Sequence, residues 1–311
     1  MKKILIFLFV LVCILLISIY AFIPSKIYFR EIVVIKANPN TAKRFLNDES
    51  QWNNWWSKEN KKNEQPINHL YKNYQYTFNW KMIQGASIAI KNNSIVVNSL
   101  LNIIPMNHDS VAVEWKGWST TPFNPLKRVE KYLKVKKLKK NLENVLQKIK
   151  NFLENKENFY PIRISKRQVK DTLLVVTSYS FKSYPTIDEV YHLIGSLQEY
   201  ISKEGAIGTN YPMLHITSDS GYFKTMVAIP VNKVVPAKGN FLFKRMVPGK
   251  ILVTEVTGGR YTTAHALKQL ENYLEDNELQ SPAIPFESLV TNRSKEPDTS
   301  KWVTKIYYPV Y

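Results

Sequence analysis

Residues 4–23 form a run of twenty residues without a charged side chain, directly after Lys2 and Lys3. A helix of that length crosses the hydrocarbon core of a bilayer. Pro24 ends the run, because proline cannot continue a helix. The sequence therefore predicts a transmembrane anchor over residues 1–25, with the rest of the 311-residue chain outside the bilayer core.

A cleaved signal peptide is the alternative interpretation of this run. The best cleavage candidate, Ile19-Tyr20-Ala21, lacks the small-x-small pattern, so an uncleaved anchor is favoured. Basic residues lie on both sides of the run, with Lys26 and Arg30 after it. Basic residues collect on the cytoplasmic side, so these charges oppose one another. We expect a single-pass protein of the cell membrane with its soluble part outside the cytoplasm.

The formal net charge of +18 is unevenly placed, with +15 in residues 1–156 and +3 in residues 157–311. A predicted helix at residues 127–156 alone carries +8, most densely over residues 134–140. This stretch is interpreted as a lipid-binding surface, a nucleic-acid surface or the solvated face of a half-buried helix. Because no helix-turn-helix, zinc pattern or RNA-binding motif accompanies it, we expect no nucleic-acid partner.

Residues 26–156 are expected to form the first soluble domain. A β-branched strand at residues 27–37 leads into a short helix, with Asn38 as N-cap and Pro39 at its first position. A helix at residues 126–154 ends the domain, with an apolar face that includes Leu142, Val145 and Ile149. Strands are predicted between them at residues 71–82, 87–91, 94–104 and 110–120.

This element order, with Asn38-Pro39 and Trp55-Trp56, resembles the START-like helix-grip fold of the polyketide cyclase and dehydrase (SRPBCC) family. The resemblance implies a curved sheet around the long helix and an apolar cavity between them. Tryptophans near that cavity either line a ligand site or pack a helix onto the sheet, and packing is expected. The set comprises Trp52, Trp55 and Trp56 near the short helix, and Trp80, Trp115 and Trp118, which are expected in the core or cavity wall.

Residues 157–311 are expected to form a second, α+β domain. Its helices are predicted from residue 185, with Val190, Ile194 and Leu197 inward, and at residues 262–276. The two helices start roughly 70–80 residues apart, each among strands, which indicates an internal repeat. The strands are predicted at residues 162–165, 171–180, 211–217, 223–230, 250–256, 283–292 and 301–311.

Three segments of this region resemble GyrI-like domains, the effector-binding modules of bacterial AraC-type and multidrug-responsive regulators. They are Met246 to Gly249 before a strand, Gly258-Gly259-Arg260-Tyr261 before a helix, and Tyr307 to Val310 at the end. The resemblance implies two βαββ-type halves with a ligand groove between them.

Glu287 stands among apolar and aromatic residues on the strand predicted at residues 283–292. A buried strand carboxylate is costly unless a partner compensates it, and a ligand is one candidate for that partner. Pro285-Phe286-Glu287 resembles the strand position of a groove glutamate in GyrI-like domains, which implies that Glu287 holds cationic aromatic ligands. A solvent-facing or lysine-paired glutamate is the alternative. Further ligand-binding candidates are Tyr211, Met213, Tyr261 and Trp302.

These features together predict a membrane-anchored protein that binds small hydrophobic or cationic aromatic molecules, for sensing, sequestration or detoxification. One alternative is a hydrolase that uses Glu287 as general acid and base. Another is a scaffold at the membrane surface. The five His and one Cys form no metal-binding pattern, and no Gly-x-Ser-x-Gly, phosphate loop or dinucleotide fingerprint is present, so neither a metal nor a cofactor is expected.

Overall fold

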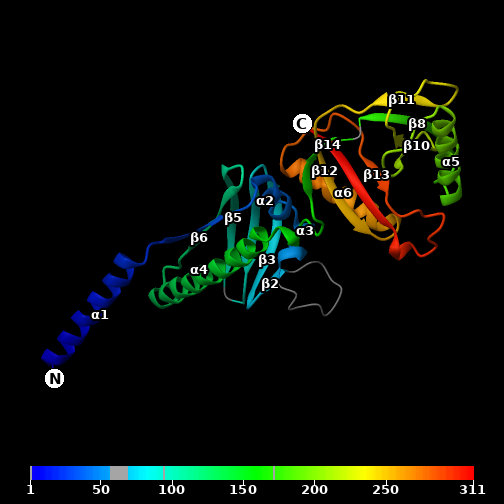
Figure 1. Cartoon of the computed structure of the whole chain (residues 1–311). Coiled ribbons are helices and arrows are strands. Elements are labelled where there is room, and N and C mark those ends of the chain that lie inside the picture. Colours follow the sequence, from blue (N-terminus) through cyan, green and yellow to red (C-terminus); the bar gives the residue numbers. More distant parts are fainter. Residues whose placement is uncertain (1, 57–68, 94, 171) are drawn as a thin grey trace. The chain divides into compact units, whose positions relative to one another are not determined.

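The computed structural model describes residues 2–56, 69–93, 95–170 and 172–311. The chain divides into two compact units, Met1–Phe159 and Tyr160–Tyr311. Figure 1 labels the elements of both units. The strand starts that the sequence predicts at residues 94 and 171 lie outside the described residues.

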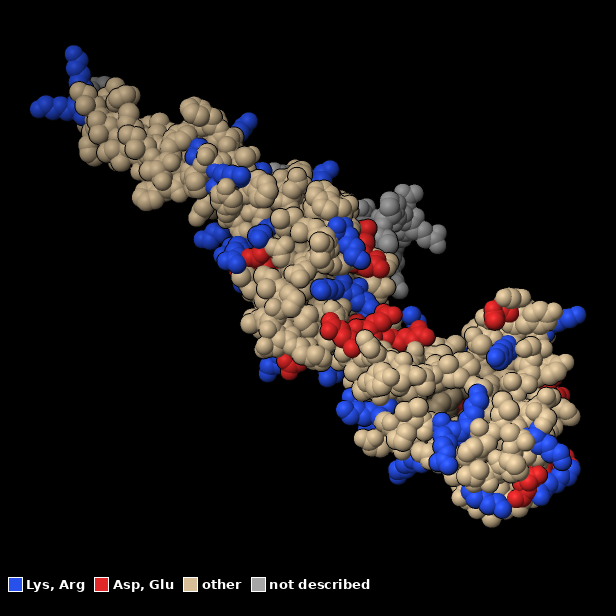
Figure 2. Space-filling view, turned by 90° about the horizontal axis from the view of Figure 1, so that it is seen from above, with Lys and Arg blue, Asp and Glu red and all other residues tan. Residues whose placement is uncertain are grey.

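The predicted apolar span is a helix, α1 (Lys2–Phe22). Its 21 residues include none that is buried, and its surface is uncharged apart from Lys2 and Lys3 at its start (Figure 2). Among the described residues it is the one helix long and apolar enough to cross a membrane, a test that a signal sequence also passes.

The first unit contains a six-stranded antiparallel sheet in the order β1-β6-β5-β4-β3-β2, flanked by three helices. The predicted strand at residues 71–82 is interrupted, because Lys72 adopts a φ of 52° in a turn. The elements are β1 (Lys26–Ile35), α2 (Pro39–Leu46), α3 (Glu49–Trp55), β2 (His69–Tyr71), β3 (Tyr74–Met82), β4 (Gly85–Lys91), β5 (Val96–Asn107), β6 (Ser110–Thr120) and α4 (Pro125–Glu154).

The predicted apolar face of α4 is buried and contacts β1. Trp52 and Trp55 are buried too, and their indole N–H groups donate to the carbonyl oxygens of Leu46 at 3.0 Å and Phe45 at 3.1 Å. Each indole therefore finds both apolar contacts and an acceptor inside the unit. The packing interpretation of these two tryptophans is confirmed.

Two of the strand tryptophans are not in the core, so that expectation is wrong for them. Trp115 is fully buried, but Trp118 is exposed, because residues three apart on a strand point to opposite faces. Trp80 is 60% exposed. It follows a register shift between Phe78 and Trp80 in β3, which changes the direction of the side chains beyond it.

The second unit has an eight-stranded sheet in the order β11-β8-β10-β9-β13-β14-β12-β7, with two helices. In chain order, β8-α5-β9-β10 and β12-α6-β13-β14 are two βαββ segments, and they meet where β9 pairs with β13. The predicted α+β class is confirmed. The elements are β7 (Ser165–Gln168), β8 (Leu173–Phe181), α5 (Ile187–Lys203), β9 (Met213–Asp219), β10 (Tyr222–Pro230), β11 (Leu242–Arg245), β12 (Lys250–Thr257), α6 (Arg260–Asp276), β13 (Phe286–Leu289) and β14 (Val303–Val310), with short 3₁₀ turns η1 (Lys156–Asn158) and η2 (Thr299–Lys301).

Two differences from the expected strands concern the sheet edges. Ile162 and Ile164 pack against the α6 cluster, and strand pairing starts only at Ser165. The edge strand β11 was not expected, because its sequence Leu-Phe-Lys-Arg lacks the alternation that marks a half-buried strand.

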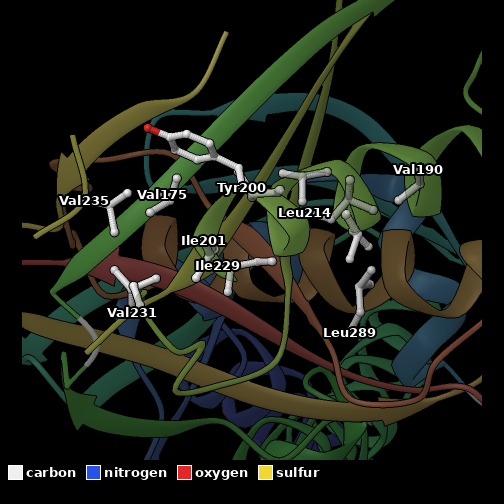
Figure 3. Packing of buried hydrophobic residues seen from close by; sticks show 13 residues of the cluster. Val175, Val190, Tyr200, Ile201, Leu214, Ile229, Val231, Val235 and Leu289 are labelled. Carbon is white, nitrogen blue, oxygen red and sulfur yellow. The ribbon is translucent and has the colours of Figure 1, made fainter. Parts of the chain in front are cut away.

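Both helices of the second unit cover the same face of its sheet. α5 begins with a capping box between Thr186 and Glu189 and packs on a cluster that includes Leu214 (Figure 3). α6 packs on a cluster that includes Ile306. Leu214 and Ile306 both lie opposite Glu287 in the strand register, and directly opposed residues point to one face. Glu287 therefore points to the helix-covered face.

Candidate ligand-binding site

A cavity of about 220 Å³ opens on the helix-covered face of the second unit and has Glu287 in its wall. We call it the Glu287 cavity. β9 and β13 pair through two residue rows, Leu214–Glu287 and Met213–Ser288, and the cavity lies beyond the first of them, where Ile216 and Pro285 line it. The remaining lining residues are Tyr184, Leu214, His215, Ile216, Arg260, Thr263, Ala264, Leu267, Pro285, Phe286 and Ile306.

Glu287 is paired within the protein. Its Oε2 accepts a hydrogen bond from Arg293 Nη2 at 3.1 Å, and the same nitrogen donates to Thr304 Oγ1 at 2.8 Å. Arg293 is 9% exposed and Glu287 is 27% exposed. The partner that the sequence predicts for the Glu287 carboxylate is therefore Arg293 and not necessarily a ligand. Glu287 neither faces solvent nor pairs with a lysine, so both alternatives are wrong.

The second carboxylate oxygen remains available to the cavity. Among the described residues no protein group donates to Glu287 Oε1. Arg293 is fixed from two sides, by Thr304 and by the Trp302 ring, whose centre is 5.1 Å from the guanidinium carbon. Glu287 is thus held in one orientation with an acceptor oxygen free, which suits a ligand that donates a hydrogen bond.

Arg260 and Tyr184 form a second polar group in the same wall. The guanidinium carbon of Arg260 lies 3.4 Å from the centre of the Tyr184 ring. Burial raises the pKa of the Tyr184 phenol, and the negative charge of Glu287 raises it further. Tyr184 therefore stays protonated at neutral pH and keeps a hydroxyl donor. Because Arg293 already compensates Glu287, Arg260 leaves this wall with an excess positive charge.

The sequence-predicted ligand residues do not converge on one cavity. Tyr261 is 92% exposed and Tyr211 is also exposed, and neither lines the Glu287 cavity. Trp302 is buried beneath Arg293, with its indole N–H donating to the Glu296 carbonyl at 2.8 Å. Met213 lines a different cavity.

Sequence reasoning missed Tyr184, Arg260 and Arg293 at this site. Arg260 was within the Gly258–Tyr261 motif, but the adjacent Tyr261 was preferred because it is aromatic. Successive helix positions point about 100° apart, and here Arg260 lines the cavity while Tyr261 points to solvent. Nothing in the local sequence of Tyr184 or Arg293 indicates the site.

The second cavity, of about 230 Å³, lies at the opposite face of the same sheet. We call it the methionine cavity, because Met213, Met226 and Met246 line it. Leu214, His215 and Phe286 line both cavities, and His215 Nδ1 lies 2.8 Å from the Pro285 carbonyl oxygen, bridging β9 to the segment before β13. In the part of the chain that the structure describes, no group of three or more His, Cys, Asp or Glu is placed to hold a metal ion.

No family model matches the chain, and no curated protein matches it. Several solved structures are similar. The C-terminal domain of EcmrR is 16% identical, with 48% of this chain and 98% of that chain covered and a TM-score of 0.42. A hydrolase from Listeria innocua is 13% identical, with 50% and 96% covered and a TM-score of 0.37. SAV2435 bound to tetraphenylphosphonium is 14% identical, with 48% and 94% covered and a TM-score of 0.32.

Proposed function

We propose that the second unit is a small-molecule-binding domain that takes an apolar aromatic ligand into the Glu287 cavity. The observation that supports this is a carboxylate oxygen presented among apolar walls while its other oxygen is held by Arg293. Such cavities, mostly apolar with a few oriented polar groups, are typical of ligand sites. We also propose that residues 157–311 form a GyrI-like domain and that residues 26–156 form a START-like domain.

The preferred ligand is a neutral ring system with a hydrogen-bond donor rather than a permanent cation. A cation without a donor has to compete with Arg293 for Glu287 and approach Arg260. A hydroxyl or N–H group instead donates to Glu287 Oε1 while the ion pair stays intact. The proposed roles are sensing, sequestration or detoxification of such compounds.

Three naphthalene probes test this choice: 2-naphthol, 2-methoxynaphthalene and the 2-naphthyltrimethylammonium cation. We expect 2-naphthol to bind tightest and to lose about tenfold or more in affinity in Glu287→Gln, because the bond to a charged acceptor is weakened. The affinity of 2-methoxynaphthalene, which has no hydrogen-bond donor, should be unchanged in Glu287→Gln. Titration calorimetry on the full chain in lipid nanodiscs measures all three affinities.

Glu255→Gln is the matched control, because Glu255 lies outside the Glu287 cavity and pairs with Lys305 on an exposed surface. If the cation binds tightest and its affinity depends on Glu287, the preferred ligand is a cation, and that cation displaces Arg293 from Glu287. Hydrolysis of the ester 2-naphthyl acetate to 2-naphthol and acetate that disappears in Glu287→Gln supports the hydrolase alternative. If the cavity binds none of the probes, the alternative of a scaffold at the membrane surface is favoured.

We further propose that α1 is retained and anchors the chain in the cell membrane. Arg128 is buried, and its Nε and Nη2 donate to the Ile23 carbonyl at 2.8 and 2.5 Å, directly after α1. Its guanidinium carbon also lies 4.8 Å from the Tyr20 ring centre. Cleavage near residue 22 would keep the Ile23 carbonyl but remove the Tyr20 ring from this guanidinium, so the contact with Tyr20 supports a permanent helix.

Retention of α1 has a direct test. The chain extracted from membranes should have an intact mass that still includes residues 2–25, and it should stay in the pellet after alkaline carbonate washing. Protease added to intact cells should digest the soluble units, because we expect them outside the cytoplasm. A mass that begins near residue 22 would establish the signal-peptide alternative instead.

A further inference from the structure

The methionine cavity lies on the face of the second unit's sheet that α5 and α6 leave uncovered. Met213 pairs with Ser288, one row away from Leu214 and Glu287, so it points away from the helices. Leu174, Val176 and Ala228 form a buried cluster around it, with Met226, Met246 and Phe286 packed against them. The floor of this cavity is therefore apolar over several strands.

Its walls are adaptable as well as apolar. Three of the six methionines in the chain line it, and methionine side chains adjust to ligands of irregular shape. Phe286 is less mobile, because its ring stacks on Tyr307 with a centre distance of 5.0 Å and an interplanar angle of 9°. A flexible wall facing a fixed ring suits an alkyl chain.

The charged residues that line the cavity are all basic. Lys244 and Arg245 of the edge strand β11 line it, and both are exposed. The strand register places the Lys244 side chain on this face beside Leu174 and turns Arg245 to the α5 face, so Lys244 supplies the charge. No Asp or Glu lines the cavity, and neither basic residue has an ion-pair partner among the described residues, although Arg245 lies 5.8 Å from the Phe243 ring centre. Val247 and Ile284 add exposed apolar side chains to the rim.

We propose that the methionine cavity binds a single-chain anionic amphiphile, with its alkyl tail on the methionines and its anionic head at Lys244. Apolar walls supply affinity for the tail, and the Lys244 ammonium selects the sign of the head group. This site lies on the opposite face of the sheet from the Glu287 cavity and binds a different chemical group. Its charged side chain attracts an anion, whereas Glu287 accepts a hydrogen bond from a neutral donor. Failure at one cavity therefore does not imply failure at the other.

Methionine methyl signals provide the readout. The full chain is labelled with [methyl-¹³C]methionine, placed in zwitterionic lipid nanodiscs and titrated with octanoate, 1-octanol and octyltrimethylammonium at dialysed free concentrations. We expect octanoate to shift the signals of Met213, Met226 and Met246 and to leave Met82 and Met106 of the first unit unchanged. Octanol should bind about tenfold more weakly, and the cation more weakly still.

Charge variants separate the head-group contact from the tail contact. Lys244→Gln should reduce octanoate affinity to that of octanol, and Arg245→Gln, on the opposite face, should not. The matched variant, Lys238→Gln, removes the same charge from a residue outside the cavity and should bind as the unmodified chain does. Unchanged methionine signals without ligand show that each variant is folded. Octanoate binding should also persist in Glu287→Gln.

Several results would overturn the proposal. Equal binding of all three octyl compounds means that the cavity takes only a tail. Unaltered octanoate affinity in Lys244→Gln contradicts the assignment of the head group to Lys244. Shifts of the same size at Met82 and Met106 indicate general partitioning. If discs that contain phosphatidylglycerol shift the three cavity signals without added octanoate, the occupant is a bilayer lipid rather than a free amphiphile.

Discussion

Arg293→Met is expected to destabilise the second unit by about 3 kcal/mol, the lower end of the range for breaking a buried ion pair. The variant leaves Glu287 without its cation and Thr304 Oγ1 without its donor. It also removes the planar group that packs on Trp302. The lower end applies because Glu287 is 27% exposed and water recovers part of the loss.

Hydrogen exchange resolved by peptide is the appropriate measurement, because a chain of two units need not unfold in one step. Peptides of residues 160–311 should lose protection, and those of the first unit should not. Adding Glu287→Gln to Arg293→Met should restore part of the stability, since a neutral pair replaces an uncompensated charge.

Lys305→Met is the control for Arg293→Met. Lys305 pairs with Glu255 at 3.5 Å on the neighbouring strands, but both side chains are more exposed than Arg293. Its loss should cost about 0–1 kcal/mol. Equal effects of the two substitutions would show that Arg293 is an ordinary surface cation and does not hold Glu287.

Trp52→Ala is expected to destabilise the first unit by about 3–5 kcal/mol, the range for removing a buried aromatic side chain. Trp52 is fully buried, stacks on Trp56 at 5.8 Å between ring centres and meets Phe78 edge-on at 5.5 Å. Its loss also leaves the Leu46 carbonyl without the indole donor. The same exchange experiment should show the change in peptides of the first unit alone.

Trp80→Ala is the matched substitution, because it removes the same side chain from a position that is 60% exposed. Its effect should stay within about 0.5 kcal/mol. A large loss from Trp80→Ala, or a small one from Trp52→Ala, would contradict the assignment of these two residues to the surface and the core.

Local patterns in the sequence were sufficient for the helices and most strands. The signals for α5 are local. They are the apolar spacing of Val190, Ile194 and Leu197 and the capping box between Thr186 and Glu189, which predict the helix and its start from the sequence alone. A short edge strand such as β11 lacks such a pattern, since its register comes from β8, which is far from it in the chain.

The candidate site was predictable only at Glu287. A carboxylate among apolar strand residues predicts that some partner exists, but the sequence does not say which cation it is. Arg293 is near in the chain, yet it lies beyond the end of β13, in a connection whose path the sequence does not specify. Tyr184 and Arg260 reach the cavity from two different helix starts, so their meeting depends on the packing of both helices on one face.

The outer strands of the second unit's sheet affect its behaviour in a crowded solution. β7 and β11 are four residues long each, and they carry Lys166 with Arg167 and Lys244 with Arg245. Unpaired edge backbone can recruit strands from other chains, and short edges with basic side chains resist this. The longer, apolar strands β8 and β12 lie one position inside them. The sheet is thereby protected at both ends from extension into aggregates.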